Sequence, residues 1–223
     1  MVKVITAIRR RPGMDLDAFT DYWQTTHAEA VKRVPGIRRY VQSQTIAAGY
    51  RAGEPAYDGI AEIWYEDTAA MHRAAATPQA AAALKDDDHF LDMKSFASIV
   101  TDEVVQLDGK AEPSMVKLNE FVIRKAGLDA VAFHRHWTEI HGPLGTTIPQ
   151  MRRYVQSHVR ASAYRDGRQP IFDGVAQVWF DDTNAMRESA KTAQYAAVRA
   201  DEPNFVDGSR LKFIITRERI IIG

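Results

Sequence analysis

The chain of 223 residues has no cysteine at all. Disulfides, thiolate catalysis and cysteine-ligated zinc or iron–sulfur sites are therefore excluded. It also has no excess of either charge, because 29 Lys and Arg residues balance 29 Asp and Glu residues. A basic surface for a phosphate backbone is not indicated, so we do not expect nucleic-acid binding.

Long apolar runs are missing too, and none approaches the roughly 18 residues that a membrane span needs. The first residues, MVKVITAIRRRPGMD, contain an apolar run too short for a signal peptide, and charge follows it. We therefore expect a soluble, cytoplasmic protein with no membrane partner. No Gly-rich nucleotide-binding pattern occurs, and we expect no cofactor and no metal.

The main positive feature is an internal repeat. Residues Phe19–Ser43 match Phe133–Ser157 at ten of 25 positions, and Tyr57–Thr68 then aligns with Phe172–Thr183. A unit of more than 100 residues is a duplicated domain rather than a solenoid repeat. We predict one repeat at 1–108, a polar linker at 109–114 and a second repeat at 115–223.

Each repeat has the pattern β-α-β-β-α-β, which is typical of a ferredoxin-like unit with both helices on one face of an antiparallel sheet. The other face is also apolar, and we assign Val4, Ile60 and Ile99 to it. We therefore predict an α+β fold, in which two such sheets pack face to face as an intramolecular pseudo-dimeric α/β barrel. Pro78 should break or kink the second helix of the first repeat, whereas the second repeat has no such proline.

Two histidines repeat one turn after a tryptophan on the first helix of each unit. Trp23 precedes His27 and Trp137 precedes His141. Gly142 and Pro143 should end the second of these helices, which would leave the His141 imidazole at a helix terminus. One alternative is a purely structural histidine that hydrogen-bonds a carbonyl at the helix end. The functional alternative is a proton carrier, since an imidazole titrates near neutral pH.

Two tyrosines repeat on the following strand, where residues two apart share a face. Polar side chains alternate with Tyr40 and Tyr154 on these strands: Arg38, Gln42, Gln44, Arg152, Gln156 and His158. Buried polar groups need partners or water, so we expect this face to line a hydrated cavity inside the barrel. A register shift of one residue would instead turn it to solvent.

The second copy resembles an EthD domain in its Trp137, His141, Pro143-Leu144 and Tyr154-Val155. The first copy departs from that pattern, with Glu29 and Ala30 at the Pro-Leu positions. The resemblance implies a dimeric α/β-barrel fold, here within one chain. It also implies similarity to 4-methylmuconolactone methylisomerase, polyketide cyclases, anthrone oxygenases and small monooxygenases that work without a bound cofactor.

By position, the resemblance implies four catalytic residues: His141, Tyr154, His27 and Tyr40. Gln156, His158, Gln42 and Arg152 are then the predicted substrate-binding residues. Asp58 and Asp173 are expected in turns. The run Asp86-Asp87-Asp88 is expected to be a solvated helix end. No carboxylate stands at a spacing that would complete a metal site with the histidines.

Three functions remain open on the sequence. The first is an isomerase or cyclase acting on a small lactone or aromatic-derived substrate, with His141 moving a proton and Tyr154 holding an oxygen. The second is a cofactorless oxidoreductase or monooxygenase. The third is a non-catalytic binding module, favoured if side chains such as Trp64 and Trp179 fill both pockets. A homo-oligomer of the pseudo-dimer is a further expectation.

Overall fold

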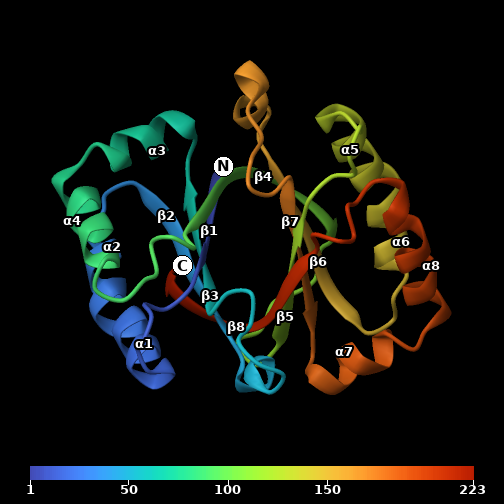
Figure 1. The fold of residues 1–223 in the computed structure, drawn as a ribbon, viewed down its shortest axis with the longest axis horizontal. Helices are drawn as coiled ribbons and strands as arrows, with labels where there is room; N and C mark the ends of the chain where they lie inside the picture. Colours follow the sequence, from blue (N-terminus) through green and yellow to red (C-terminus); the bar gives the residue numbers. More distant parts are fainter. The chain divides into compact units, whose positions relative to one another are not determined.

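The computed structural model describes all residues, 1–223. The elements of the first copy, in chain order, are β1 (Val2–Ile8), α1 (Leu16–Tyr22), η1 (Trp23–His27), α2 (Ala28–Lys32), β2 (Ile37–Thr45), η2 (Ala47–Tyr50), β3 (Gly59–Tyr65), α3 (Thr68–Ala75), α4 (Pro78–Asp87) and β4 (Ala97–Leu107). Those of the second copy are β5 (Val116–Val122), α5 (Ala130–His136), η3 (Trp137–His141), α6 (Gly142–Thr146), β6 (Met151–Val159), η4 (Ala161–Gly167), β7 (Gly174–Phe180), α7 (Thr183–Ser189), α8 (Ala193–Asp201), η5 (Glu202–Asn204) and β8 (Lys212–Ile222). Figure 1 labels most of them.

The strands hydrogen-bond in the order β1-β3-β2-β8-β5-β7-β6-β4, which closes as a barrel. This confirms the predicted α+β barrel of two ferredoxin-like repeats. The chain forms two compact units: the first comprises residues 1–100 and 218–223, and the second comprises 101–217. The predicted linker lies between β4 and β5. No helix has the length and apolar character to cross a membrane.

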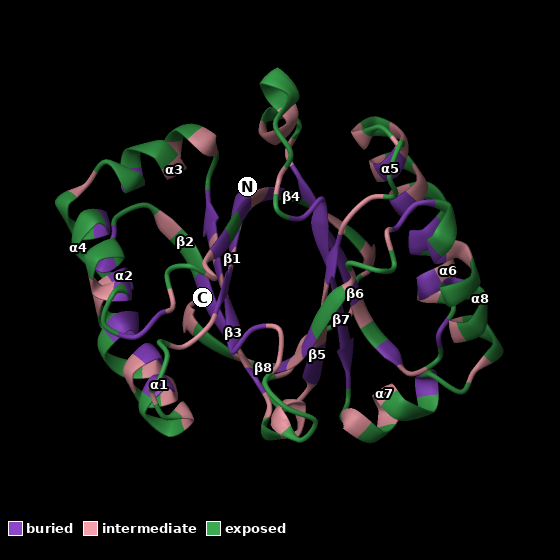
Figure 2. Cartoon of the chain, in the orientation of Figure 1, coloured by how far each residue is buried: buried purple, intermediate pink, exposed green.

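In each unit the sheet has a face covered by helices and an opposite face. Within the first unit, β1 pairs with β3 so that Val4 lies beside Ile63 on the helix-covered face, and Ala7 lies beside Ile60 on the opposite face. Val4 packs with the core beneath the helices, so its assignment to the opposite face was wrong. Successive side chains of a strand point to opposite faces, so residues of one strand contribute to both faces of the sheet. Figure 2 shows the strands largely buried and the outer helix surfaces exposed.

The first helical region of each copy is interrupted by a π-helical turn, at Trp23–His27 and at Trp137–His141. The prediction that Pro143 ends the helix was wrong, because α6 continues from Gly142 to Thr146. The helix is continuous through His141, and Pro143 follows a π-helical turn in which Gln106 donates to the carbonyl of Thr138. In this turn the N–H of Gly142 donates to the carbonyl of Trp137 five residues earlier. Such turns occur frequently at functional sites.

The second helical region is broken in both copies, including the one without proline. Thr77 caps α4 by accepting the N–H of Ala80, and Thr192 caps α8 by accepting that of Tyr195. Pro78 occupies the first turn of α4, a position that suits proline. The break therefore follows from the threonine cap that both copies share, rather than from the proline alone.

Candidate functional site

The second unit contains a cavity of about 530 Å³ between its sheet and its helices, here called the second-unit cavity. Alternate residues of β5, Leu118, Glu120 and Val122, line it, as do Ala176, Val178 and Phe180 of β7. The helices contribute Trp137, His141, Arg199 and Glu202. Most of the wall is apolar, which is typical of a small-molecule site in which a few polar groups set orientation.

His141, at the end of η3, lines this cavity and is held from behind by Asp201. The two side chains meet at 3.0 Å between Nδ1 and Oδ2. Asp201 also receives hydrogen bonds from His136 and from the amide of Asn204. The His141 ring packs 4.7 Å from that of the buried Phe205. These contacts fix the imidazole and leave Nε2 as the nitrogen available to a ligand.

The protonation states follow from burial and pairing. Burial lowers the pKa of His141 below its ordinary value of 6.5, although the Asp201 carboxylate opposes that shift. Burial acts to raise the pKa of Asp201, but hydrogen bonds from Asn204, His136 and His141 outweigh it and the pKa is lowered. At neutral pH His141 is therefore a neutral imidazole that donates from Nδ1 to an ionised carboxylate. Such an imidazole can act as a base at Nε2.

Tyr154, on β6, lines the same cavity. Its hydroxyl accepts hydrogen bonds from the indole N–H of Trp137 at 3.2 Å and from the amide of Gln156 at 3.0 Å. Burial raises the pKa of Tyr154 to about 12, although both donors oppose that shift. The hydroxyl thus keeps its proton. With two donors already bound, that proton is free to be donated to an oxygen of a ligand.

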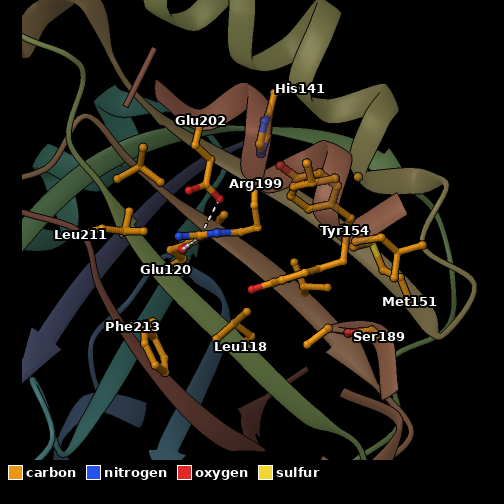
Figure 3. A pocket seen from close by; sticks show the side chains of 18 of the residues that line it. Leu118, Glu120, His141, Met151, Tyr154, Ser189, Arg199, Glu202, Leu211 and Phe213 are labelled. Atoms are coloured by element: carbon orange, nitrogen blue, oxygen red, sulfur yellow. Dashed lines mark hydrogen bonds and ion pairs between the residues drawn. The ribbon is translucent and has the colours of Figure 1, made fainter. Parts of the chain in front are cut away.

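A charged cluster lies in the wall of the same cavity. Arg199 Nη1 lies 2.6 Å from Glu202 Oε1 and 3.7 Å from Glu120 Oε1. Figure 3 shows the guanidinium reaching toward both carboxylates. Burial, with the nearby Glu120 charge, raises the pKa of Glu202 to about 7, and burial also raises the pKa of Glu120.

The first unit has a corresponding but smaller cavity of about 280 Å³, here called the first-unit cavity. His27 and Tyr40 line it, and His27 Nδ1 lies 2.9 Å from Asp86 Oδ2. Asp87 lines it as well, 3.6 Å from His27 Nε2, and burial raises the pKa of Asp87 to about 7. The expectation that Asp86–Asp88 is only a solvated helix end was wrong for Asp86 and Asp87.

The first-unit cavity lacks the charged cluster of the second. Thr6 stands at the position of Glu120, and Leu84 stands at that of Arg199. Thr6 instead shares a 3.1 Å hydrogen bond with Ser98. The two cavities therefore share a histidine, an orienting aspartate and a tyrosine, and differ in the cation and one carboxylate.

The predicted polar strand residues lie mostly behind the cavity wall. Gln156 donates to the Trp137 carbonyl and to Tyr154, and Gln42 repeats both bonds with Trp23 and Tyr40. His158 Nε2 donates to the side-chain oxygen of Gln156 at 3.0 Å, and His158 lies outside the cavity lining. These side chains support the tyrosines.

Arg152 is not with them. It lies at a β-bulge between Met151 and Arg153, and its guanidinium pairs with Asp181 at 2.6 Å on the surface. A bulge shifts the alternation of side chains along the strand. The prediction that Arg152 shares the face of Tyr154 was therefore wrong.

The tyrosine face is the one covered by helices, whereas we expected it to point into the barrel. The opposite face carries Val155 and Ser157 of β6. On the tyrosine face, ring packing leaves no room for a side chain at Gly174, where a Cβ would lie 2.5 Å from Trp137 Cζ3. A Cβ at Gly59 would likewise lie 2.7 Å from the Trp23 ring, so the glycine of each Asp-Gly pair is required by packing. The Asp173 carboxylate accepts hydrogen bonds from the backbone N–H and from the guanidinium of Arg124, so its role is not limited to the expected turn.

The sequence reasoning missed Asp201, Glu202, Arg199 and Glu120. Their separation of up to 82 residues from one another hides them from any local motif. The repeat itself carried one signal, because Asp86-Asp87 aligns with Asp201-Glu202 at the same offset that aligns Asp58 with Asp173. No group of three or more potential ligands is arranged to hold a metal ion.

Comparison with solved structures shows the same fold over nearly the whole chain. An anthrone oxidase-like protein matches with a TM-score of 0.67 at 10% identity, covering 99% of this chain and 93% of that one. A proposed monooxygenase from Lactobacillus acidophilus NCFM has a TM-score of 0.59 at 13% identity, covering 98% and 94%. A mutant chlorite dismutase from Candidatus Nitrospira defluvii has a TM-score of 0.55 at 9% identity, covering 96% and 91%.

A search of curated protein sequences finds no match. The EthD domain, in contrast, matches residues 11–94 and again residues 125–209, a span that includes the histidine, tyrosine and Asp-Gly positions of both copies. The chain therefore belongs to the EthD family and carries its domain twice.

Proposed function

We propose that the protein is a small-molecule enzyme that isomerises or cyclises a lactone or aromatic-derived compound by acid–base chemistry in the second-unit cavity. One observation carries this proposal. His141, oriented by Asp201, and the proton-bearing hydroxyl of Tyr154 line one cavity with largely apolar walls. A base and a hydrogen-bond donor in the same enclosure are what proton transfer next to a carbonyl requires.

The chemistry follows from the two protonation states. His141 Nε2 accepts a proton from a carbon next to the carbonyl, and the electron pair of that C–H bond moves onto the carbonyl oxygen. The Tyr154 hydroxyl donates a hydrogen bond to this oxygen as negative charge develops there. His141 then returns the proton to another carbon, so that the enzyme is unchanged. A positioned base contributes about 10²–10⁴-fold to such a step.

His27 and Tyr40 form the second candidate pair. We place the main reaction in the second unit for two reasons: its cavity has about twice the volume, and it alone contains the charged cluster. In the first unit, Asp87 faces His27 Nε2 and competes with a ligand for that nitrogen.

The test is solvent deuterium exchange into a panel of ketones and lactones with acidic C–H groups, followed by mass spectrometry. The wild-type chain should exchange at least one member of the panel. His141→Gln should abolish that exchange while the protein stays folded, and the matched variant His27→Gln should retain most of it. Equal loss in both variants would refute the assignment to the second unit.

A cofactorless oxidoreductase is the runner-up, and the same base in the same apolar enclosure supports it. There the carbanion reacts with oxygen instead of regaining a proton. Oxygen uptake with an anthrone, dependent on His141, would favour this reading over isomerisation. A binding module is the third reading. Trp64 and Trp179 lie outside both cavity linings and do not fill the cavities. Support for a binding module would therefore have to come from a ligand that binds without deuterium exchange or oxygen uptake.

A further inference from the structure

The charged cluster of the second-unit cavity holds fewer positive charges than negative ones. Arg199 comes from α8, Glu202 from the following η5, and Glu120 from β5. One guanidinium therefore faces two carboxylates. The Glu120 and Glu202 side chains are only 24% and 11% exposed, and two carboxylates that share one cation in a largely apolar cavity favour the binding of a proton.

The other groups around the cavity do not supply the missing positive charge. Burial keeps His141 neutral, as its lowered pKa indicates, and Asp201 behind it adds to the negative charge beside Glu202. Tyr154 stays protonated because its pKa is about 12. Arg187, on α7, is a second cation of the lining, but it forms no ion pair with Glu120 or Glu202, and its Nη1 donates to the side-chain oxygen of Asn184 at 2.9 Å. The other ionisable side chain of the lining is Tyr195 of α8, a phenol that cannot carry a positive charge.

An organic anion would resolve this imbalance in a specific way. The planar guanidinium binds a carboxylate through two parallel hydrogen bonds. If the anion takes the place of the Glu202 carboxylate on Arg199, Glu202 loses its cationic partner and becomes a neutral acid by binding a proton. The charge of the cluster is then the same before and after binding, because one negative charge and one proton enter together.

We propose that the second-unit cavity binds a ligand with an apolar ring body and a carboxylate or comparable anionic oxygen, which pairs with Arg199 while Glu202 takes up a proton. This rests on the proposed function in that it concerns the same cavity. The first-unit cavity lacks such an anion site, because Leu84 stands in place of the arginine and no Lys or Arg lines that cavity. The duplicated domain thus offers two cavities of different ligand chemistry.

The experiment is isothermal titration of the full chain with 2-naphthoate, which is ionised throughout the pH range, and with the neutral 2-naphthamide of the same shape. Titrations at pH 6.0 to 8.5 use two buffers with different ionisation enthalpies, so that protons taken up are counted. We expect naphthoate to bind at least about tenfold more tightly than naphthamide at pH 6, as a charge-assisted pair predicts. Its Kd should rise about tenfold per pH unit above neutrality, with about one proton taken up per ligand.

Variants assign the effect to residues. Arg199→Leu, which reproduces the residue of the first unit, should remove the preference for naphthoate and leave naphthamide binding intact. Arg135→Leu, at an exposed arginine of α5 outside the cavity lining, should behave as the wild type. Glu202→Gln should keep naphthoate binding and lose the proton uptake. Thermal melts check folding, and Arg199→Gln serves as a second variant if the leucine variant is unstable.

The outcomes separate the two proposals. If naphthamide binds but naphthoate is not preferred, or if its preference survives Arg199→Leu, the anion site is refuted while the cavity remains a ligand site. Preference without proton uptake, or uptake that survives Glu202→Gln, refutes the role of Glu202. If neither compound binds at any pH, the anion site is refuted, and the proposed function is then decided by the deuterium-exchange test alone.

Discussion

His141 and Asp201 are joined by a hydrogen bond of 3.0 Å between Nδ1 and Oδ2, and the first unit repeats the arrangement with His27 and Asp86 at 2.9 Å. A histidine held through Nδ1 by an ionised carboxylate has its tautomer fixed, with the lone pair on Nε2. The two copies have kept this pairing although the surrounding cavities differ in size and charge.

Asp201→Asn should therefore reduce turnover more than it reduces stability. The amide can donate to Nδ1 and so favour the wrong tautomer of His141, which removes the base from Nε2. We expect deuterium exchange to fall by at least about tenfold. Asp86→Asn in the first unit is the matched control, and an equal loss there would contradict the placement of the reaction in the second unit.

The activity of the wild type should persist below the ordinary histidine range. Because burial lowers the pKa of His141 below 6.5, the neutral base survives to lower pH, and the acid limb of kcat/KM should lie below pH 6.5. A limb at or above 6.5 that His141→Gln does not remove would assign the base to another group.

Glu202 should make the folded protein less stable as the pH rises. Its pKa is raised from 4.5 to about 7, so the folded state holds the proton more tightly than the unfolded state. The resulting stabilisation is fully present below pH 4.5 and is lost as the pH rises through 7. Urea unfolding at pH 5 and pH 8 should differ by about 1–3 kcal/mol from this group. Glu202→Gln should flatten the difference, whereas an unchanged difference would exclude Glu202 as its source.

Tyr154→Phe should lose activity and some stability. The variant removes the acceptor of the Trp137 and Gln156 hydrogen bonds, which leaves a buried indole N–H without its partner. We expect a loss of about 1–3 kcal/mol in the free energy of unfolding. Tyr40→Phe should cost a similar amount of stability, because Gln42 donates to Tyr40 in the same way, but it should retain most of the exchange activity. A Tyr154→Phe enzyme of full activity would remove the tyrosine from the proposed chemistry.

Gly174→Ala should destabilise the second unit. Its Cβ would lie 2.5 Å from Trp137 Cζ3 and 2.6 Å from the Ser157 carbonyl oxygen, and neither the buried ring nor the strand backbone can move freely. Overpacking of this kind costs about 1–3 kcal/mol or more. Gly208→Ala is the control, since a Cβ there meets nothing within 4 Å. Equal melting temperatures for the two variants would contradict this packing.

Much of the fold could be predicted because the two repeats of the chain can be compared with each other. The repeat of Trp, His and Tyr at constant spacing located equivalent helices and strands, and the two apolar sheet faces predicted the barrel. The direction of Tyr154 could not be predicted, since a shift of one residue exchanges the two faces of a strand. The bulge beside Arg152 is such a shift, and the sequence around it carries no signal that predicts a bulge.

The histidine and tyrosine of the candidate site could be proposed from their recurrence, whereas their partners could not. Asp201 follows His141 by 60 residues, and only tertiary packing of α8 against α6 and η3 brings the carboxylate to the ring. Arg199 has no counterpart in the first copy, so the repeat could not single it out. The aligned acids at 86–87 and 201–202 were the one available signal, and a charged helix end is so common on protein surfaces that it concealed them.

The last strand has a practical consequence for handling the protein. Residues 218–223 belong to the first compact unit, and Ile221 and Ile222 pack against its core beside Val2 and Tyr40. A purification tag, a protease trim or a truncation at the carboxyl end is therefore a perturbation of the amino-terminal half. Cutting the chain at the linker would likewise separate that half from a part of its own core, so the two repeats cannot be assayed as simple halves.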